Sequence, residues 1–463
     1  MVQRSLATSV PQWCSYYGVQ CDTYNGSVTY GSVTQISVGG LSLTGSIPSS
    51  IGSLKSLTYL DLYSNSLRGP IPSSIGLLTA LLQLNLYSNS LTGTIPSSVG
   101  SLTALLYLKL YGNKLTGTIP SSIGLLTSLQ QLIFGGNSLK GRIPSSLGLM
   151  TSLQALWLGE NSLTGSIPSI IGSMRSLTVL AIDRSSLSGS IPSSIGLLTA
   201  LQYIHFGSNS MNGTIPSSIS LLSALQTLIL TSNKLQGSIP SNVLSMALLH
   251  FVDISANSLT GAIPSNLGAS LQQMILNSNS LSGIPSSIAS LASLNSLIMS
   301  SNKLVGTIPS FLWLMTFLRE LDLGANSLIG TIPSIVGSLT ALQYLALNNN
   351  SLTGALSGSI GSMVALVALV LSANSLVGTI PSTFSKLSNL KYLYLDTNYL
   401  TMGSATTLSN STFSSKTLSW NISLSRNCLA FHYGSISVSA THCAPTACKS
   451  TNANVQLWLQ YFL

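Results

Sequence analysis

The stretch that decides the fold reads Leu57-Thr-Tyr-Leu60-Asp-Leu62-Tyr-Ser-Asn65-Ser-Leu67-Arg-Gly69-Pro-Ile71-Pro72. Its Leu-x-Leu step has a period of two, which is typical of a short β-strand. The Asn65 amide has donors and an acceptor, so it can satisfy backbone groups where the chain leaves the strand. Gly69 permits a close backbone approach. Pro72 lacks an N–H and suits a turn or an edge. The stretch therefore predicts a strand followed by a tight turn.

This unit repeats along most of the chain. Equivalents of Asn65 recur mainly at intervals of 24 residues, as far as Asn398. Leu41 and Ser185 fit the register without Asn, which gives 16 repeats over residues 33–403. Two intervals, on either side of Asn279, are shorter, at 22 and 23 residues. A single unit cannot bury its own Leu side chains, so the units must stack, and the Asn residues must then form an internal ladder.

The composition excludes several protein classes. Of 463 residues, 17 are Lys or Arg and 8 are Asp or Glu, so that 5% are charged and the net charge is +9. An ordinary soluble domain has about 25% charged residues. The apolar content of 45% is too high for a disordered chain. No apolar run approaches the roughly 18 residues that a membrane helix needs.

The repeat resembles the plant-type leucine-rich repeat, above all in its Leu-x-Gly-x-Ile-Pro segment. That form is found in receptor ectodomains and in secreted inhibitor proteins of plant cell walls. The resemblance covers residues 33–403. It implies an α/β-type repeat solenoid, a right-handed superhelix with a parallel β-sheet on the concave face and mostly β, irregular and 3-10 structure elsewhere. It does not imply a particular ligand, because one fold serves many partners.

The N-terminal flank, residues 1–32, is interpreted as a cysteine cap. Its segment Cys14-Ser-Tyr-Tyr-Gly-Val-Gln-Cys21 resembles the N-terminal cap of the same family, with Tyr16 where Trp is usual. The resemblance implies a Cys14–Cys21 disulfide and an extracellular location, secreted or at the cell surface. No signal peptide is visible before Cys14, so we interpret the N terminus as processed or incomplete. The alternative is a cytosolic protein with free thiols.

The C-terminal flank, residues 404–463, is interpreted as a β-rich cysteine cap with an apolar tail. Alternating apolar residues predict a half-buried strand: Leu418, Trp420, Ile422 and Leu424. Cys428 and Cys443 flank a predicted hairpin that a disulfide could close. Cys448 is then left over from the predicted pairs. It is free, pairs with a different cysteine or links two chains. The apolar tail is too short to span a bilayer, and we expect it to dock on a surface.

Five Asn-x-Ser/Thr sequences are predicted glycan acceptors in a secreted protein. The alternative is that a chain rich in Asn, Ser and Thr makes such triplets by chance. The acceptor positions are Asn25, Asn212, Asn349, Asn410 and Asn421.

Catalytic, metal and nucleic-acid signatures are not found in the sequence. The eight acidic residues are scattered, without the carboxylate pair of a glycosidase. Glu320 and Asp322 share one strand face, and we interpret them, with Arg319, as a surface ion cluster. No His-Cys spacing suits zinc, and no basic stripe suits nucleic acid. We therefore predict no enzymatic activity, no metal and no cofactor.

The outward-facing strand positions form the candidate binding surface. Strand side chains alternate between core and solvent, and aromatic or Ile side chains at solvent-facing positions mark an interaction patch. The alternative is the general preference of such residues for strands. Clustered Tyr suits sugar stacking, and a central Ile-Trp-Phe band suits protein. The predicted contact residues are Tyr59, Tyr63, Tyr87, Tyr107, Tyr111, Ile133, Trp157, Tyr203, His205, Ile229, Phe251, Ile275, Ile298, Tyr344, Tyr392 and Tyr394.

Hydroxyl side chains form the other repeated feature. Most Ile-Pro pairs precede Ser-Ser, as at Ser73-Ser74, and follow Thr or Ser, as at Thr94. Stacking turns these residues into rows. The rows are an uncharged hydrophilic coat, carriers of O-linked glycans, or a water-ordering surface of an ice-binding solenoid.

Three functions are compatible with these features. The leading hypothesis is a structural or scaffold glycoprotein of a cell wall, surface layer or filament that contacts other proteins or copies of itself. The second is a ligand-binding receptor-like ectodomain or secreted inhibitor with a protein or glycan partner, and the third is ice binding. Net charge usually keeps proteins apart, so the low charge places self-assembly first.

Overall fold

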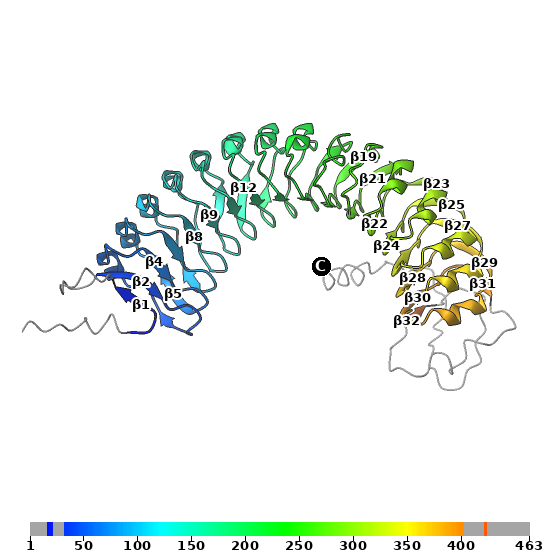
Figure 1. Cartoon of the computed structure of the whole chain (residues 1–463), viewed down its shortest axis with the longest axis horizontal. Helices are drawn as coiled ribbons and strands as arrows, with labels where there is room; N and C mark the ends of the chain where they lie inside the picture. Colours follow the sequence, from blue (N-terminus) through cyan, green and yellow to red (C-terminus); the bar gives the residue numbers. More distant parts are fainter. Residues whose placement is uncertain (1–15, 22–31, 402–420, 424–463) are drawn as a thin grey trace, which may run out of the picture.

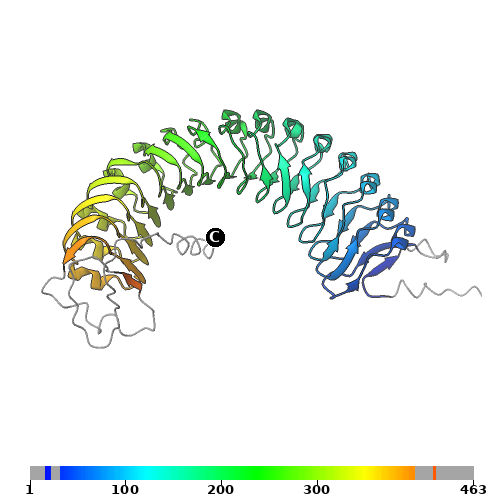
Figure 2. The same cartoon turned by 180° about the vertical axis from the view of Figure 1, so that it is seen from behind.

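The computed structural model describes residues 16–21, 32–401 and 421–423. They form a curved solenoid whose inner, concave surface is lined by one long sheet and whose outer surface carries short turns (Figure 1). The same curvature is seen from behind (Figure 2). The predicted leucine-rich-repeat solenoid with a parallel concave sheet is therefore confirmed.

The concave sheet has 18 strands. All its pairings are parallel except β1–β2, which is antiparallel. The strands are β1 (Val19–Cys21), β2 (Val33–Ser37), β4 (Tyr59–Asp61), β6 (Gln83–Asn85), β8 (Tyr107–Lys109), β9 (Gln131–Ile133), β11 (Ala155–Trp157), β13 (Val179–Ala181), β15 (Tyr203–His205), β16 (Thr227–Ile229), β18 (Phe251–Asp253), β20 (Gln273–Ile275), β22 (Ser296–Ile298), β24 (Glu320–Asp322), β26 (Tyr344–Ala346), β28 (Ala368–Val370), β30 (Tyr392–Tyr394) and β32 (Asn421–Ser423). Strand β32 pairs with β30, so the strand predicted in the C-terminal flank extends the main sheet at residues 421–423.

Four shorter parallel sheets run along the side of the solenoid. Their strands begin one to three residues after the ladder position of most repeats, where the Leu-x-Gly segment lies, but no such strand follows Asn113 or Asn209. Their strands are β3 (Thr44–Gly45), β5 (Ser66–Pro70) and β7 (Ser90–Thr92); β10 (Lys140–Arg142), β12 (Ser162–Gly165) and β14 (Ser186–Leu187); β17 (Gln236–Gly237), β19 (Ser258–Ala262) and β21 (Ser280–Gly283); and β23 (Val305–Thr307), β25 (Ser327–Thr331), β27 (Ser351–Ala355), β29 (Ser375–Thr379) and β31 (Tyr399–Thr401).

The outer surface is built from five-residue 3-10 helices. They are η2 (Ser49–Ser53), η3 (Ser73–Leu77), η4 (Ser97–Ser101), η5 (Ser121–Leu125), η6 (Ser145–Leu149), η7 (Ser169–Ser173), η8 (Ser193–Leu197), η9 (Ser217–Leu221), η10 (Ser286–Ser290), η11 (Ser310–Leu314), η12 (Ser334–Ser338), η13 (Gly358–Ser362) and η14 (Ser382–Lys386). None forms between η9 and η10, within residues 222–285. The first shortened repeat lies in this interval, where turns absorb its missing residues.

The predicted Asn ladder is present. The Asn113 side-chain amide donates to the carbonyl oxygens of Leu86 at 2.9 Å and Leu110 at 3.0 Å, and its oxygen accepts from the Leu91 N–H at 3.0 Å. Each ladder Asn thus joins its own turn to the preceding repeat. Buried backbone groups need such partners, because an unpaired one costs about 1–3 kcal/mol.

The Ser-Ser-Ile-Gly segment of the outer surface has a packing reason. A Cβ atom on Gly76 would lie 2.3 Å from the Ser98 carbonyl oxygen of the next repeat. The Ser98 hydroxyl, in turn, donates to the Ser73 carbonyl oxygen at 2.6 Å. The second Ser of such a pair therefore links adjacent repeats through a hydrogen bond, and the first Ser is the exposed member of the hydroxyl row.

Candidate functional site

The predicted contact residues lie where the alternation places them. Each is in a strand of the concave sheet or, as with Tyr63, two residues after a strand ends. Most are half-buried, and Trp157 and Tyr59 are the most exposed, at 43% and 38%. Ile298 is wrong as a contact residue because only 4% of its surface is exposed. It lies directly between Ile275 and Asp322 of the adjacent strands, and strands only about 4.8 Å apart leave little of such a side chain uncovered.

Four aromatic rings stack in the N-terminal half, and we call them the aromatic ladder: Tyr63, Tyr87, Tyr111 and Trp157. Successive ring centroids are 4.8, 4.4 and 6.4 Å apart, with interplanar angles of 10°, 9° and 13°. Both faces of Tyr87 and of Tyr111 are covered by neighbouring rings. Those faces are not available to a sugar, so the sugar-stacking interpretation of the clustered Tyr fails for these two residues.

A glycine explains how Trp157 joins the ladder. The repeat after Tyr111 has Gly135 at the ladder position, and Trp157 belongs to the next strand. A Cβ atom on Gly135 would lie 3.0 Å from Trp157 Nε1, so the indole occupies the space that a ring would fill.

Burial and the adjacent Tyr111 and Tyr63 raise the pKa of Tyr87. Its hydroxyl is therefore a hydrogen-bond donor at neutral pH.

The centre of the face holds a polar group around His205. His205 Nδ1 lies 3.6 Å from Asp183 Oδ1, and the Tyr203 ring contacts the imidazole edge-on at a centroid distance of 6.3 Å. Burial lowers the pKa of His205, although Asp183 opposes the shift, so the imidazole is mostly neutral at pH 7. Asp253 accepts hydrogen bonds from the Ser255 hydroxyl at 2.5 Å and its N–H at 3.0 Å, and burial raises the pKa of this carboxyl.

Glu320 and Asp322 do not form the predicted surface ion cluster. Glu320 accepts from the Ser296 hydroxyl at 2.7 Å, and Asp322 accepts from the Gly324 N–H at 2.9 Å. Burial raises the pKa of both carboxyls. Burial also raises the pKa of Tyr344 on the next strand, and the two carboxylates add to this shift. The expected Arg319 partner forms no ion pair within the described residues.

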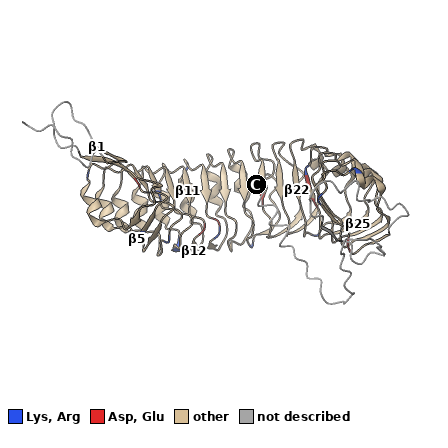
Figure 3. Ribbon diagram, turned by 90° about the horizontal axis from the view of Figure 1, so that it is seen from below, with Lys and Arg blue, Asp and Glu red and all other residues tan. Residues whose placement is uncertain are grey.

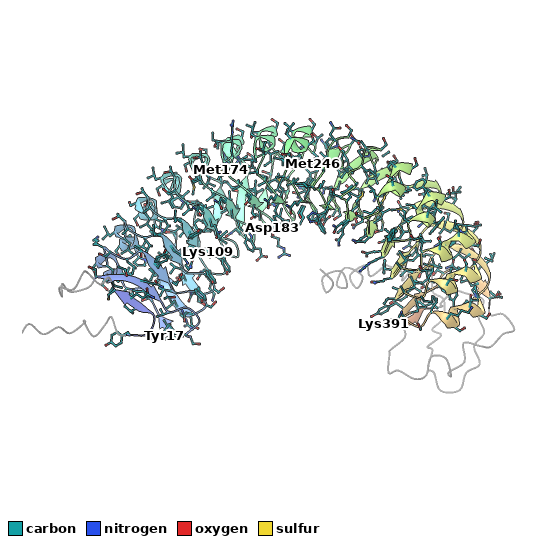
Figure 4. The ribbon with its side chains drawn as sticks, in the orientation of Figure 1. Tyr17, Lys109, Met174, Asp183, Met246 and Lys391 are labelled. Atoms are coloured by element: carbon teal, nitrogen blue, oxygen red, sulfur yellow. The ribbon has the colours of Figure 1, made fainter. Side chains whose placement is uncertain are left out.

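Charged residues are sparse along the described ribbon (Figure 3). Lys109 is the one Lys or Arg within the described strands of the concave sheet. The described ion pairs are Arg184–Glu160 at 2.5 Å, where both side chains are about half exposed, and His205–Asp183. Figure 4 shows Lys109 and Asp183 at the inner edge of the arc.

Comparisons with known proteins agree with this geometry. Family profiles described as leucine-rich repeats match residues 316–376 and residues 56–78, 80–102, 104–126 and 152–174. The ectodomain of the Arabidopsis receptor kinase HAESA, solved with the peptide hormone IDA and the co-receptor SERK1, is 32% identical over 84% of this chain and 77% of its own, with a TM-score of 0.67. The chain is a plant-type leucine-rich-repeat protein.

Two further solved structures are similar to this leucine-rich-repeat protein. The ectodomain of the Arabidopsis thaliana receptor kinase GASSHO1/SCHENGEN3, in complex with CASPARIAN STRIP INTEGRITY FACTOR 2, is 34% identical over 80% of the chain, with a TM-score of 0.66, and the chain spans about half (50%) of that ectodomain. The Leptospira interrogans protein LIC12759 is 31% identical over 79% of the chain and 90% of its own, with a TM-score of 0.65. No curated protein matches the sequence.

The remaining predicted sites of this leucine-rich-repeat protein are partly described. Asn212 and Asn349 are exposed, as glycan acceptors must be, and Asn421 begins β32. Cys21 is disulfide-bonded, and its predicted partner Cys14 lies outside the described residues. So do Asn25, Asn410, Cys428, Cys443 and Cys448.

Neither a metal-binding cluster nor a membrane-spanning helix is present in the part of the chain that the structure describes. No group of three or more His, Cys, Asp or Glu within the described residues could hold a metal ion. None of the helices that the structure describes is long and apolar enough to cross a membrane.

Proposed function

We propose that this leucine-rich-repeat protein is a non-enzymatic extracellular binding module that holds an extended polypeptide along its concave sheet. The observation that carries the proposal is the uninterrupted sheet, on which Trp157 and Tyr59 are exposed and Phe251 is half-buried. Large aromatic side chains give contact area at low entropic cost. The similar HAESA ectodomain was solved with the peptide hormone IDA, which supports the same use of the fold here.

A random-peptide library displayed on phage tests this function with the full chain. Peptides retained by the wild type should be lost when Trp157→Asp and Phe251→Asp are combined. They should be kept by Leu221→Asp, a matched change at a side chain that is 60% exposed on the outer helix η9. Circular dichroism checks that each variant is folded. Equal retention by all three proteins would exclude the concave sheet as the binding surface.

Self-assembly is a second candidate, and one observation favours it. Val305, Ile329 and Val377 lie on β23, β25 and β29 of one lateral sheet and are 69%, 51% and 45% exposed. Exposed apolar sheet positions of this kind favour association. Light scattering should then show oligomers that Ile329→Lys dissociates, and a monomer at high concentration would remove the candidate. Ice binding, O-linked glycans and N-linked glycans stay predictions.

A further inference from the structure

The carboxylates of the concave face recur at a fixed interval in the C-terminal half of the solenoid. We number the repeats from the one that contains Leu41 and define the carboxylate row by the acidic residues of repeats 10, 13 and 16. Asp253 ends β18, Glu320 and Asp322 lie in β24, and Asp396 follows β30. Each of these strands is separated from the next by two strands of the sheet. Three strand steps correspond to about 14 Å. Asp183 of repeat 7 falls at the same interval but is left out of the row, because only 5% of its surface is exposed.

No Lys or Arg side chain of the described residues pairs with the carboxylate row. Asp396 accepts from the Ser372 hydroxyl at 2.8 Å, and Asp253, Glu320 and Asp322 likewise accept from hydroxyl or backbone donors. A partly buried carboxylate without a cation is a costly arrangement, because burial removes the water that would solvate its charge. An incoming cation would supply the missing counter-charge.

The basic side chains nearest the row do not fill this role. Arg319 and Lys391 precede β24 and β30 by one residue, at the start of the strands, and neither forms an ion pair with a described carboxylate. Other basic residues of the described part lie elsewhere, such as Lys140 and Arg142 on the lateral strand β10 and Lys386 on the outer helix η14. Among the described residues, no Lys or Arg therefore neutralises a carboxylate of the row.

The interval also fits the geometry of an extended chain. An extended polypeptide rises about 3.3 Å per residue, so about 14 Å corresponds to four residues. Side chains four residues apart in such a chain point to the same side. A peptide that runs along the solenoid, across the strands, would thus bring a side chain to each member of the row.

We infer that the concave face selects an extended peptide with a basic side chain at every fourth residue, whose cations pair with the carboxylates of repeats 10, 13 and 16. This inference rests on the proposed function and names the chemistry of its partner. Complementary charges across an interface set register and specificity, so spacing matters as well as charge.

Synthetic fluorescent peptides and the full chain test the inference by anisotropy. The first probe has four lysines separated by three serines each. The second has the same lysines in one block, and the third and fourth replace the lysines by glutamines or glutamates. The spaced-lysine probe should bind about tenfold more tightly than each of the others. Net charge alone would instead favour the glutamate probe, because the protein is positive.

Matched variants locate the effect. Asp253→Asn combined with Asp322→Asn keeps the shape of both side chains and should weaken binding of the spaced-lysine probe about tenfold. Glu160→Gln removes a carboxylate outside the row, one that pairs with Arg184, and should leave binding unchanged. An equal effect of both variants, or equal affinity for the block and spaced lysines, would overturn the inference.

The peptide library separates this inference from the function on which it rests. Concave-dependent peptides enriched in Lys and Arg would support both. Concave-dependent peptides without that enrichment would leave the proposed function standing and refute the basic partner. Absence of any concave-dependent peptide would refute the proposed function itself, and the basic partner with it.

Discussion

Half-buried side chains have different neighbours in the two halves of the concave face. In the N-terminal half, the rings of Tyr63, Tyr87, Tyr111 and Trp157 cover one another. In the C-terminal half, Asp253, Glu320 and Asp322 are half-buried and accept hydrogen bonds from hydroxyl or backbone donors, but no Lys or Arg of the described residues pairs with them. The ladder is complete within the molecule, whereas the carboxylates still lack a counter-charge. An aromatic column can therefore be structural, and the sparse acidic residues are the stronger sign of a partner.

The largest expected effect tests whether the two halves share one scaffold. Asn113→Ala and Asn374→Ala each remove a buried ladder amide, one in each half, and leave several backbone groups unpaired. Each change should lower the free energy of unfolding by about 3 kcal/mol, to be measured by urea titration. Strongly unequal losses of unfolding free energy would show that the two halves differ in how their Asn ladder supports the backbone, as well as in their surface.

The enclosed rings of the aromatic ladder, Tyr87 and Tyr111, are expected to contribute stability and little to recognition of a basic peptide. Tyr111→Ala removes two ring contacts and should cost about 2 kcal/mol in thermal unfolding experiments. The control Tyr111→Phe keeps the ring and should be nearly neutral. Affinity for the spaced-lysine peptide should not change in either variant. A large loss of affinity in Tyr111→Ala would show that an enclosed ring of the ladder also takes part in recognition.

The smallest expected effect is a gain of stability rather than a loss, and it concerns two carboxyls of the concave face. Burial raises the pKa of Glu320 and Asp322, so the folded state binds protons more tightly than the unfolded state, and stability falls as pH rises through these pKa values. Glu320→Gln with Asp322→Asn removes this cost and should stabilise the protein by about 1 kcal/mol at pH 7.

The pH dependence provides the control. The gain from the double change should disappear below about pH 4, where the wild-type carboxyls are protonated in both states. Melting temperatures recorded across this range check the sign. A double variant that is less stable than the wild type at pH 7 would mean that its carboxylates are already well compensated within the chain.

The sequence predicted the elements that depend on one repeat and missed those that depend on two. Strands, the ladder amide of Asn113 and the turn glycines follow from residues close in sequence, and the structure has them. The position of Trp157 over Gly135 and the burial of Ile298 depend on neighbours one repeat away, whose sizes decide what is covered. The burial of Glu320 and Asp322 was missed for the same reason, because Tyr344 lies one strand further.

The interval without 3-10 helices, residues 222–285, has a mechanical consequence. In a solenoid, each repeat is held by its two neighbours, so resistance to separation is a sum of local interfaces. Elsewhere the outer helices stack from one repeat to the next, but η9 and η10 have no such helix between them. The repeats of this interval are held together by the concave sheet, the Asn ladder, the hydrophobic core and the lateral strands β17, β19 and β21, without stacked outer helices. A pull on the two ends of the arc should open the molecule first at this joint.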